Sequence, residues 1–132
     1  MKTILALAAS AAVLIGAANV ANARGQLIFA PYDAPAVASA VQSEQRHLLV
    51  FTKNGCPVCT RQVVELEKLL ATPEFRGLRV WQVDVVKQKE LAARYGVTKQ
   101  STLVVYDDGR ELARRQGVTA TDGIAALLRT RA

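Results

Sequence analysis

The two cysteines of this 132-residue chain, Cys56 and Cys59, are the residues best suited to chemistry. Thiols at this spacing can form a disulfide with each other and exchange it with the thiols of another protein. A bridge that closes so short a loop adds little stability, because the entropic gain of a disulfide grows with loop length. The spacing therefore indicates a pair that is oxidised and reduced repeatedly, in preference to a structural crosslink.

The residues around this pair predict a strand, a short loop and a helix. The apolar residues 48–51 lead into the pair, and the helix-like residues 61–71 follow it. Pro57 suits the first turn of a helix, where no backbone N–H is needed. Unpaired N–H groups and the positive end of the helix dipole stabilise an anion there by about 0.3–1 kcal/mol, and up to about 2. That energy lowers the pKa of a thiol from about 8.5 to somewhat above 7.

Helical periodicity distinguishes the two sulfurs. Val63, Leu66 and Leu70 follow Cys59 at the spacing of one helix face, so we expect Cys59 to be turned toward the core. Cys56, at the helix cap, is then the exposed sulfur. An accessible attacking thiol with a buried resolving partner is the arrangement that thiol–disulfide exchange requires.

The N-terminal residues have the pattern of a signal peptide. Met1-Lys2 is a short basic start, and the uncharged residues 4–18 form an apolar run shorter than the roughly 20 residues that span a bilayer. Ala21-Asn22-Ala23 offers the small residues that a signal peptidase reads. We expect residues 1–23 to be cleaved and residues 24–132 to form one domain in the periplasm. The alternative is an uncleaved N-terminal anchor.

The net charge of +6 does not indicate a nucleic-acid partner. The basic residues are scattered and lack interleaved aromatic residues, whereas a nucleic-acid site clusters them on one face. His47, the only histidine, has no metal-ligand partner in the sequence, and we expect it on the surface. We expect no cofactor and no metal ion in the working protein.

The remaining sequence predicts strands that alternate with helices. Strands are expected at residues 26–30, 48–52, 78–86, 102–106 and 111–116, and helices at residues 36–46, from the cysteines to residue 71, and at 88–95. A last helix, capped by Thr121 or Asp122, turns Ile124, Leu127 and Leu128 inward. Asp108-Gly109 predicts a hairpin turn, and Trp81 is expected to pack in the core or in an interface. The order predicts an α/β fold with a central mixed β-sheet and helices on both faces.

Residues 24–132 resemble the thioredoxin superfamily. The matching segments are Leu49-Val50-Phe51, Cys56-Pro57-Val58-Cys59, Val83-Asp84, Tyr95-Gly96-Val97, Thr102-Leu103-Val104-Val105-Tyr106, Asp108-Gly109 and Gly117. The resemblance implies a thioredoxin-like fold and a redox disulfide in which Cys56 attacks the substrate and Cys59 resolves the mixed disulfide. It also implies that the substrate contacts Pro57, Val58, Gln100 and Ser101.

Three positions depart from the pattern of the family. Ser101 stands where family members carry a cis-proline. A cis bond before serine would cost about 2.5–4 kcal/mol, so we expect the Gln100–Ser101 bond to be trans. Val50 replaces a buried aspartate, which leaves no obvious carboxylate to take the proton of Cys59. Gly55 replaces a tryptophan and leaves Cys56 less shielded.

The sequence thus predicts a periplasmic thiol–disulfide oxidoreductase that acts on protein thiols and disulfides through a Cys-Pro-Val-Cys dithiol. We expect a monomer and a membrane redox partner. Because Val58 carries no positive charge, a mild reductase or isomerase is favoured over a strong oxidant. Two alternatives stay open: a module that binds Cu(I) or another metal through the same cysteines, and a redox-inert interaction domain.

Overall fold

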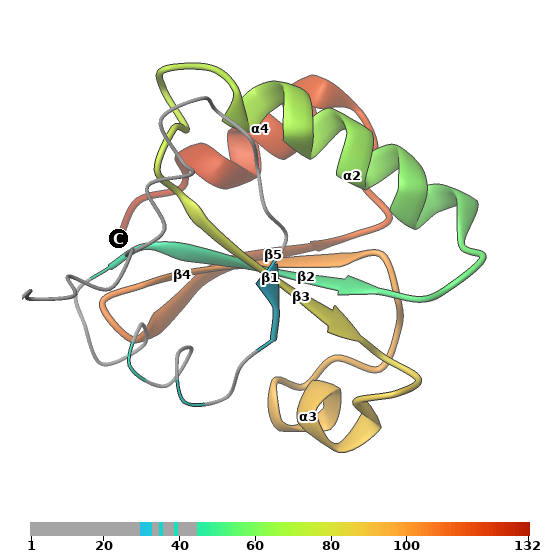
Figure 1. Cartoon of the computed structure of the whole chain (residues 1–132). Helices are drawn as coiled ribbons and strands as arrows, with labels where there is room; N and C mark the ends of the chain where they lie inside the picture. Colours follow the sequence, from blue (N-terminus) through green and yellow to red (C-terminus); the bar gives the residue numbers. More distant parts are fainter. Residues whose placement is uncertain (1–29, 33–34, 36–38, 40–44) are drawn as a thin grey trace, which may run out of the picture.

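A mixed five-stranded sheet forms the centre of the molecule in the computed structural model, which describes residues 30–32, 35, 39 and 45–132. The strand order is β1-β3-β2-β4-β5. The strands are β1 (Ala30–Pro31), β2 (His47–Thr52), β3 (Arg79–Asp84), β4 (Thr102–Asp107) and β5 (Arg110–Gln116), and the helices are α2 (Pro57–Leu70), α3 (Lys89–Arg94) and α4 (Thr121–Arg129). Helices α2 and α4 cover one face of the sheet and α3 lies on the other (Figure 1). The predicted mixed sheet with helices on both faces is confirmed.

The central strand, β2, is buried along its whole length. It pairs in parallel with β3, where Leu49 lies opposite Trp81, and antiparallel with β4. Leu48 and Val50 pack toward α2 and α4, whereas Leu49 and Phe51 pack in the core on the side of α3. An unbroken apolar run is what a strand covered on both faces requires. Trp81 lies in the core, as predicted.

One edge of the sheet gathers three chain segments beside the start of α2. Strand β2 ends at this edge, β4 starts there and β5 ends there, since β4 runs antiparallel to both of its neighbours. Thr102 accordingly pairs with Phe51 on one side and with Gln116 on the other. The residues just before β4 and just after β5 therefore approach the loop that leads from β2 into α2.

Two predicted elements fall largely outside the described residues. Of the predicted strand at 26–30, Ala30 belongs to β1. Of the predicted helix at 36–46, Ser39 is helical, whereas Gln45 and Arg46 are not. The predicted cap of the last helix is wrong. Ala120 is the N-cap of α4, and Thr121 is its first helical residue. Its hydroxyl donates instead to a Glu65 carboxylate oxygen on α2, at 2.7 Å, and so ties the two helices together.

The surface position predicted for His47 is also wrong. This residue begins β2 and is fully buried. Its ring stacks on Tyr106 with 5.3 Å between the ring centroids, and Nδ1 lies 3.3 Å from the carbonyl oxygen of Gln45. Burial lowers the pKa of His47 below its ordinary value. The lack of a metal-ligand partner does not imply exposure, because β3 and β4 pair with His47 on both sides.

The hairpin predicted at Asp108-Gly109 joins β4 to β5. Both residues have positive φ, 49° and 69°, as a two-residue turn of type I′ requires. Among the described residues, no helix is both long enough and apolar enough to cross a membrane.

Candidate active site

The loop before α2 places Cys56 at the N-cap of the helix. Gly55 has a φ of 70°, which turns the chain from the end of β2 toward the helix axis, and Pro57 occupies the first helical turn. The Cys59 N–H donates a hydrogen bond to Cys56 Sγ at 3.2 Å. This first turn holds no acidic residue, so no neighbouring carboxylate on it opposes a negative charge on the cap sulfur.

Cys56 and Cys59 form a disulfide whose two sulfurs differ in exposure. Cys56 is half-buried, whereas Cys59 is only 4% exposed. Cys59 shares the buried face of α2 with Leu66 and Leu70, as the periodicity predicted, although Val63 is only half-buried. The predicted geometry of an outer and an inner sulfur is therefore present.

Ser101 brings a hydroxyl group to both sulfurs. Its Oγ lies 3.4 Å from Cys56 Sγ and 3.2 Å from Cys59 Sγ, and the residue is 4% exposed. The backbone of Ser101 has a φ of 61°. The described part of the chain contains no cis peptide bond, so the prediction of a trans Gln100–Ser101 bond is confirmed.

Gln62, which was not among the predicted site residues, holds the loop of Ser101 against α2. The residue is fully buried, and its Nε2 donates to the carbonyl oxygens of Ser101 at 3.0 Å and Val118 at 2.8 Å. The Gly117 N–H donates to the same Ser101 oxygen at 2.8 Å. The available signal was the position of a glutamine three residues after Cys59, on the core side of the helix, where a polar group needs a partner.

A surface depression of about 440 Å³ opens beside the exposed sulfur. All four residues predicted to contact substrate, Pro57, Val58, Gln100 and Ser101, line it together with Cys56. The other lining residues are Lys53, Asn54, Gly55, Gln116 and Gly117. Gln116 was not among the predicted site residues, and the pairing of β4 with β5 brings it there. The structure brings the predicted residues together, and their contact with substrate stays a prediction.

The charge around this depression favours an anion. Lys53 is the one charged residue among its lining residues in the described part of the chain. Val50, at the position where the family has an aspartate, is fully buried among apolar neighbours. A thiolate at Cys56 therefore faces a helix N-terminus and a lysine without a carboxylate beside it.

The metal-binding alternative would use the two cysteines as its protein ligands. Among the side chains that the structure describes, no group of three or more His, Cys, Asp or Glu residues is arranged to hold a metal ion. Cys56 and Cys59 supply two sulfur ligands, whereas a structural zinc site takes four ligands.

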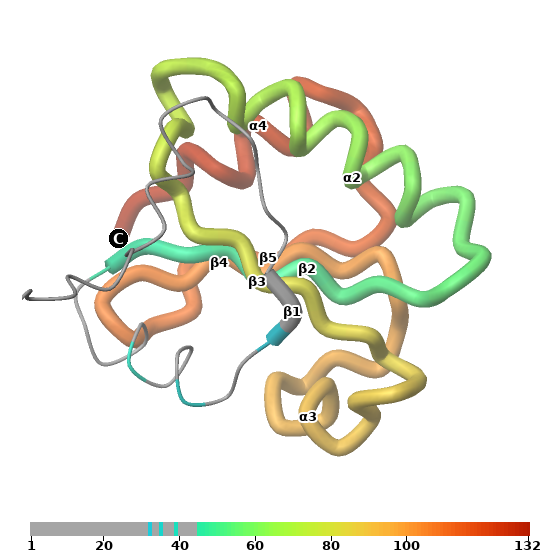
Figure 2. The backbone as a smooth tube through the Cα atoms, viewed as in Figure 1, coloured from blue at the N-terminus to red at the C-terminus, as the bar shows by residue number. Residues whose placement is uncertain are grey.

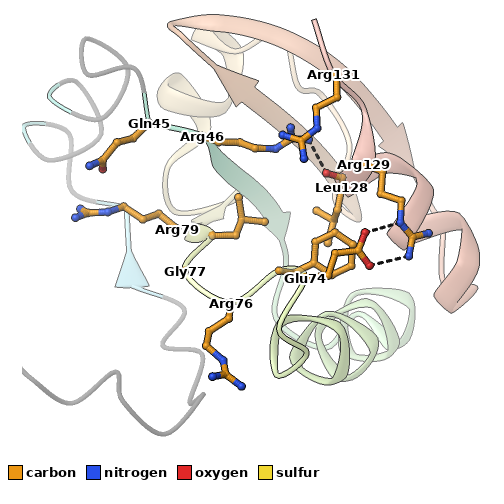
Figure 3. Close-up of a pocket in the computed structure, with 11 residues that line it drawn as sticks. Gln45, Arg46, Glu74, Arg76, Gly77, Arg79, Leu128, Arg129 and Arg131 are labelled. Carbon is orange, nitrogen blue, oxygen red and sulfur yellow. Dashed lines mark hydrogen bonds and ion pairs between the residues drawn. The ribbon is translucent and has the colours of Figure 1, made fainter.

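A second pocket, of about 500 Å³, lies at the other end of α2 and contains neither cysteine. The loop before α2 and the turn after it lie at opposite ends of the molecule (Figure 2). Figure 3 shows that Arg76 and Arg79 point in different directions around this pocket. Arg129 forms two hydrogen bonds with Glu74, and Arg46 donates to the Leu128 and Thr130 carbonyl oxygens. The guanidinium groups of Arg46 and Arg131 lie near each other, whereas Arg76 and Arg79 point away from them (Figure 3).

Comparison with known proteins agrees with this geometry. The family model for Thioredoxin matches residues 32–130. The crystal structure of Trxlp from Edwardsiella tarda EIB202 is similar, with a TM-score of 0.72 and 37% identity over 76% of this chain and 97% of that chain. A thioredoxin from Trypanosoma brucei brucei shares the fold, with a TM-score of 0.67 and 18% identity over 80% of this chain and 90% of that one.

A curated relative points the same way. Thioredoxin 2 of Plasmodium falciparum (isolate 3D7) is 27% identical over 84 residues, which are 62% of this chain and 52% of that protein, so the match spans about half the length of the relative. The expected thioredoxin-like fold is confirmed. The family and the cysteine pair together support thiol–disulfide oxidoreductase activity. The chain belongs to the thioredoxin family.

Proposed function

We propose that this chain is a thiol–disulfide oxidoreductase that exchanges disulfides with protein thiols through Cys56 and Cys59. One observation carries the proposal. The disulfide lies at the N-terminus of α2, with one sulfur beside an open depression and the other beneath it. A pair buried on both sides could not meet a protein substrate, and a fully exposed pair would lack a protected resolving thiol.

The chemistry follows from this arrangement. In the dithiol, the Cys56 thiolate attacks one sulfur of a substrate disulfide, a bond forms between Cys56 and the substrate, and the other substrate sulfur leaves as a thiolate. Cys59 then loses its proton to water and attacks Cys56 Sγ. The Cys56–substrate bond breaks and its electron pair leaves on the second substrate sulfur. Two electrons pass to the substrate, and the reverse sequence oxidises a substrate dithiol.

The rim of the depression is proposed to bind the polypeptide that carries the reacting sulfur. Exposed Pro57 and half-buried Val58 offer apolar surface on the helix side of Cys56. Half-buried Gln100 offers an amide group on the opposite side, where buried Ser101 also lines the depression. An apolar rim beside a few polar groups suits a short polypeptide segment better than a small, highly charged ligand.

We further propose that residues 1–23 are a cleaved signal peptide and that residues 24–132 act as a monomer in the periplasm. A membrane partner would return electrons to the pair. Val58 adds no positive charge beside the thiolate, so mild reductase or isomerase activity is the proposed direction. The basis is the sequence pattern of the first 23 residues and the composition of the motif. Mass spectrometry of the exported protein tests the cleavage, since the mature chain should begin at Arg24.

Reduction of insulin disulfides tests the activity. The wild-type protein, supplied with dithiothreitol, should accelerate insulin precipitation, and Cys56→Ser should lose this acceleration because the attacking thiol is gone. Cys59→Ser should also turn over poorly, because its mixed disulfides persist. Circular dichroism should show that both variants are folded. Equal rates for wild type and Cys56→Ser would instead identify a redox-inert interaction domain.

A further inference from the structure

The Ser101 hydroxyl is placed to serve both sulfurs in turn. Its Oγ lies within 3.4 Å of Cys56 Sγ and within 3.2 Å of Cys59 Sγ. A hydroxyl carries one proton and therefore donates one hydrogen bond at a time. The sulfurs of a disulfide are weak acceptors, whereas an ionised acceptor roughly doubles the strength of a hydrogen bond. The contact thus becomes strong only when one of the two sulfurs becomes a thiolate.

The backbone of Ser101 is held in a conformation that serine rarely adopts. A φ of 61° lies in the left-handed region, which is uncommon for residues other than glycine. Such a conformation persists only where the surroundings impose it. Here the Gln62 side chain and the Gly117 N–H both donate to the Ser101 carbonyl oxygen. The backbone held in this way directs Ser101 Oγ at the two sulfurs.

Cys59 has few other polar neighbours. In the described part of the chain, Ser101 Oγ is the one side-chain group hydrogen-bonded to Cys59 Sγ. Burial alone would raise the pKa of such a thiol, because desolvation disfavours the charged form. The resolving step nevertheless needs Cys59 as a thiolate. Val50 supplies no group to take the proton of Cys59, which goes to water, and a hydrogen-bond donor at this sulfur can stabilise the thiolate that is left.

We propose that Ser101 is a catalytic residue whose hydroxyl donates its one hydrogen bond first to the Cys56 thiolate and then to the Cys59 thiolate. This role rests on the proposed function. In the dithiol, Oγ–H donates to the Cys56 thiolate. Once Cys56 is bound in a mixed disulfide it carries no charge, and the hydroxyl donates to Cys59, which loses its own proton to water. Cys59 then displaces the substrate thiolate from Cys56, and Ser101 keeps its proton throughout.

Removal of the hydroxyl should raise the pKa of both thiols. The pKa of Cys56 is measured in a Cys59→Ala background, and that of Cys59 in a Cys56→Ala background, by thiolate absorbance at 240 nm. Ser101→Ala and Ser101→Gly should each raise both pKa values by about one unit, as expected for the loss of a hydrogen bond to a charged group. Glycine relieves the positive φ and alanine retains it. A role for backbone shape alone would therefore separate the two variants, whereas a role for the hydroxyl gives the same result in both.

A kinetic experiment examines the resolving step. Reaction of the dithiol with 5,5′-dithiobis(2-nitrobenzoate) releases one thionitrobenzoate when Cys56 attacks and a second when Cys59 resolves the mixed disulfide. At pH 7 the second phase should slow about tenfold in Ser101→Ala and Ser101→Gly, because about tenfold less Cys59 thiolate is present. The pH midpoint of this phase should move up by the same amount as the pKa of Cys59.

Thr102→Val provides the matched control. It removes a neighbouring buried hydroxyl that bonds to a carbonyl oxygen and touches neither sulfur, so the thiol pKa values and both kinetic phases should stay as in wild type. Unchanged pKa values in both Ser101 variants, or an equal shift in Thr102→Val, would overturn the role of Ser101.

These measurements use no protein substrate. If wild type failed to reduce insulin while the hydroxyl still set the thiol pKa values, the proposed function would fail, whereas the hydrogen bonds from Ser101 to the two thiolates would stand.

Discussion

Cys56 and Cys59 differ in their surroundings although two residues separate them. The helix places Cys56 at its N-cap beside solvent and turns Cys59 toward the core. The positive end of the helix dipole stabilises a charge at Cys56, whereas burial disfavours a charge at Cys59. The difference in exposure follows from helix geometry, and sequence periodicity was enough to predict it.

Gln62 provides a test of how the site is held at the residue scale. Gln62→Leu removes two hydrogen-bond donors and leaves the Val118 carbonyl oxygen without its side-chain partner. We expect the free energy of unfolding to fall by about 1–3 kcal/mol, which urea denaturation of the oxidised protein would measure. The exposed change Glu67→Gln on the same helix should stay within about 0.5 kcal/mol of wild type. If Gln62→Leu were as stable as wild type, Gln62 would not hold the loop.

The sequence did not predict contacts between residues that are far apart in the chain. The periodicity of α2 identified Cys59, Leu66 and Leu70 as inward residues, but it could not show that Gln62 would meet the Ser101 loop. The two residues are separated by 39 positions in the chain and meet because β4 starts beside α2. Ser101 was expected to contact substrate, and its contact with both sulfurs emerged only from the structure.

The elements position the site through the pairing of β2 with β4. Because β4 is antiparallel to β2 and to β5, the loops at residues 53–56, 99–101 and 117–120 gather at one edge of the sheet. The strands were predictable because apolar strand patterns alternate with helical patterns along the sequence, and the hairpin was predictable from Asp108-Gly109. Whether a polar residue at a strand end is buried, as His47 is, was not predictable, because its burial depends on which strands flank it.

The burial of His47 in β2 should make the stability of the protein depend on pH. Burial holds the folded pKa of His47 below the ordinary value of about 6.5, although its contact with the Gln45 carbonyl and the charge of Asp107 act in the opposite direction. Below pH 6.5 the unfolded chain therefore binds more protons than the folded protein. The free energy of unfolding should fall as the pH drops from 7 toward 5, by up to about 1.4 kcal/mol per pH unit.

The measurement is a series of urea denaturation curves between pH 5 and 7.5. His47→Phe keeps a ring to stack on Tyr106 and removes the titrating group, so its curve should be much flatter over this range. His47 is the only histidine in the chain, which assigns the difference to one residue. Equal slopes for wild type and His47→Phe would show that burial does not perturb His47.

At the scale of the whole molecule, the two pockets lie at opposite ends of α2. A helix of 14 residues is about 21 Å long, which exceeds the Debye length of about 8 Å at physiological ionic strength. Charges around the pocket of about 500 Å³ should therefore not influence the cysteines. The larger pocket is thus not the candidate active site, despite its size.

A pair of charge reversals tests this separation. Lys53→Glu and Arg76→Glu make the same change in charge, one beside the cysteines and one at the distal pocket. With the neutral reagent iodoacetamide at physiological ionic strength and pH 7, we expect Cys56 in Lys53→Glu to be alkylated more slowly than in wild type, because a carboxylate near a thiolate disfavours it. Arg76→Glu should match wild type. Similar slowing in both variants would contradict local control of the thiolate.

The architecture was the most predictable level of this molecule. Alternating strands and helices, a turn signal and the position of the cysteine pair were sufficient for the α/β fold and for the edge that carries the site. The local sequence of residues 99–102 could exclude a cis bond, but it could not give the positive φ of Ser101. That conformation depends on Gln62 and Gly117, which come from other elements.

Trapping of a mixed disulfide tests the central claim most directly. Cys59→Ala is reduced, mixed with a disulfide-linked peptide and analysed by mass spectrometry after blocking of free thiols. We expect a covalent adduct between the peptide and Cys56, since the attacking thiol remains and the resolving thiol is gone, and no adduct with Cys56→Ala. The absence of any adduct with Cys59→Ala, or equal adducts at the inner sulfur of Cys56→Ala, would contradict the assignment of Cys56 as the attacking thiol and Cys59 as its resolving partner.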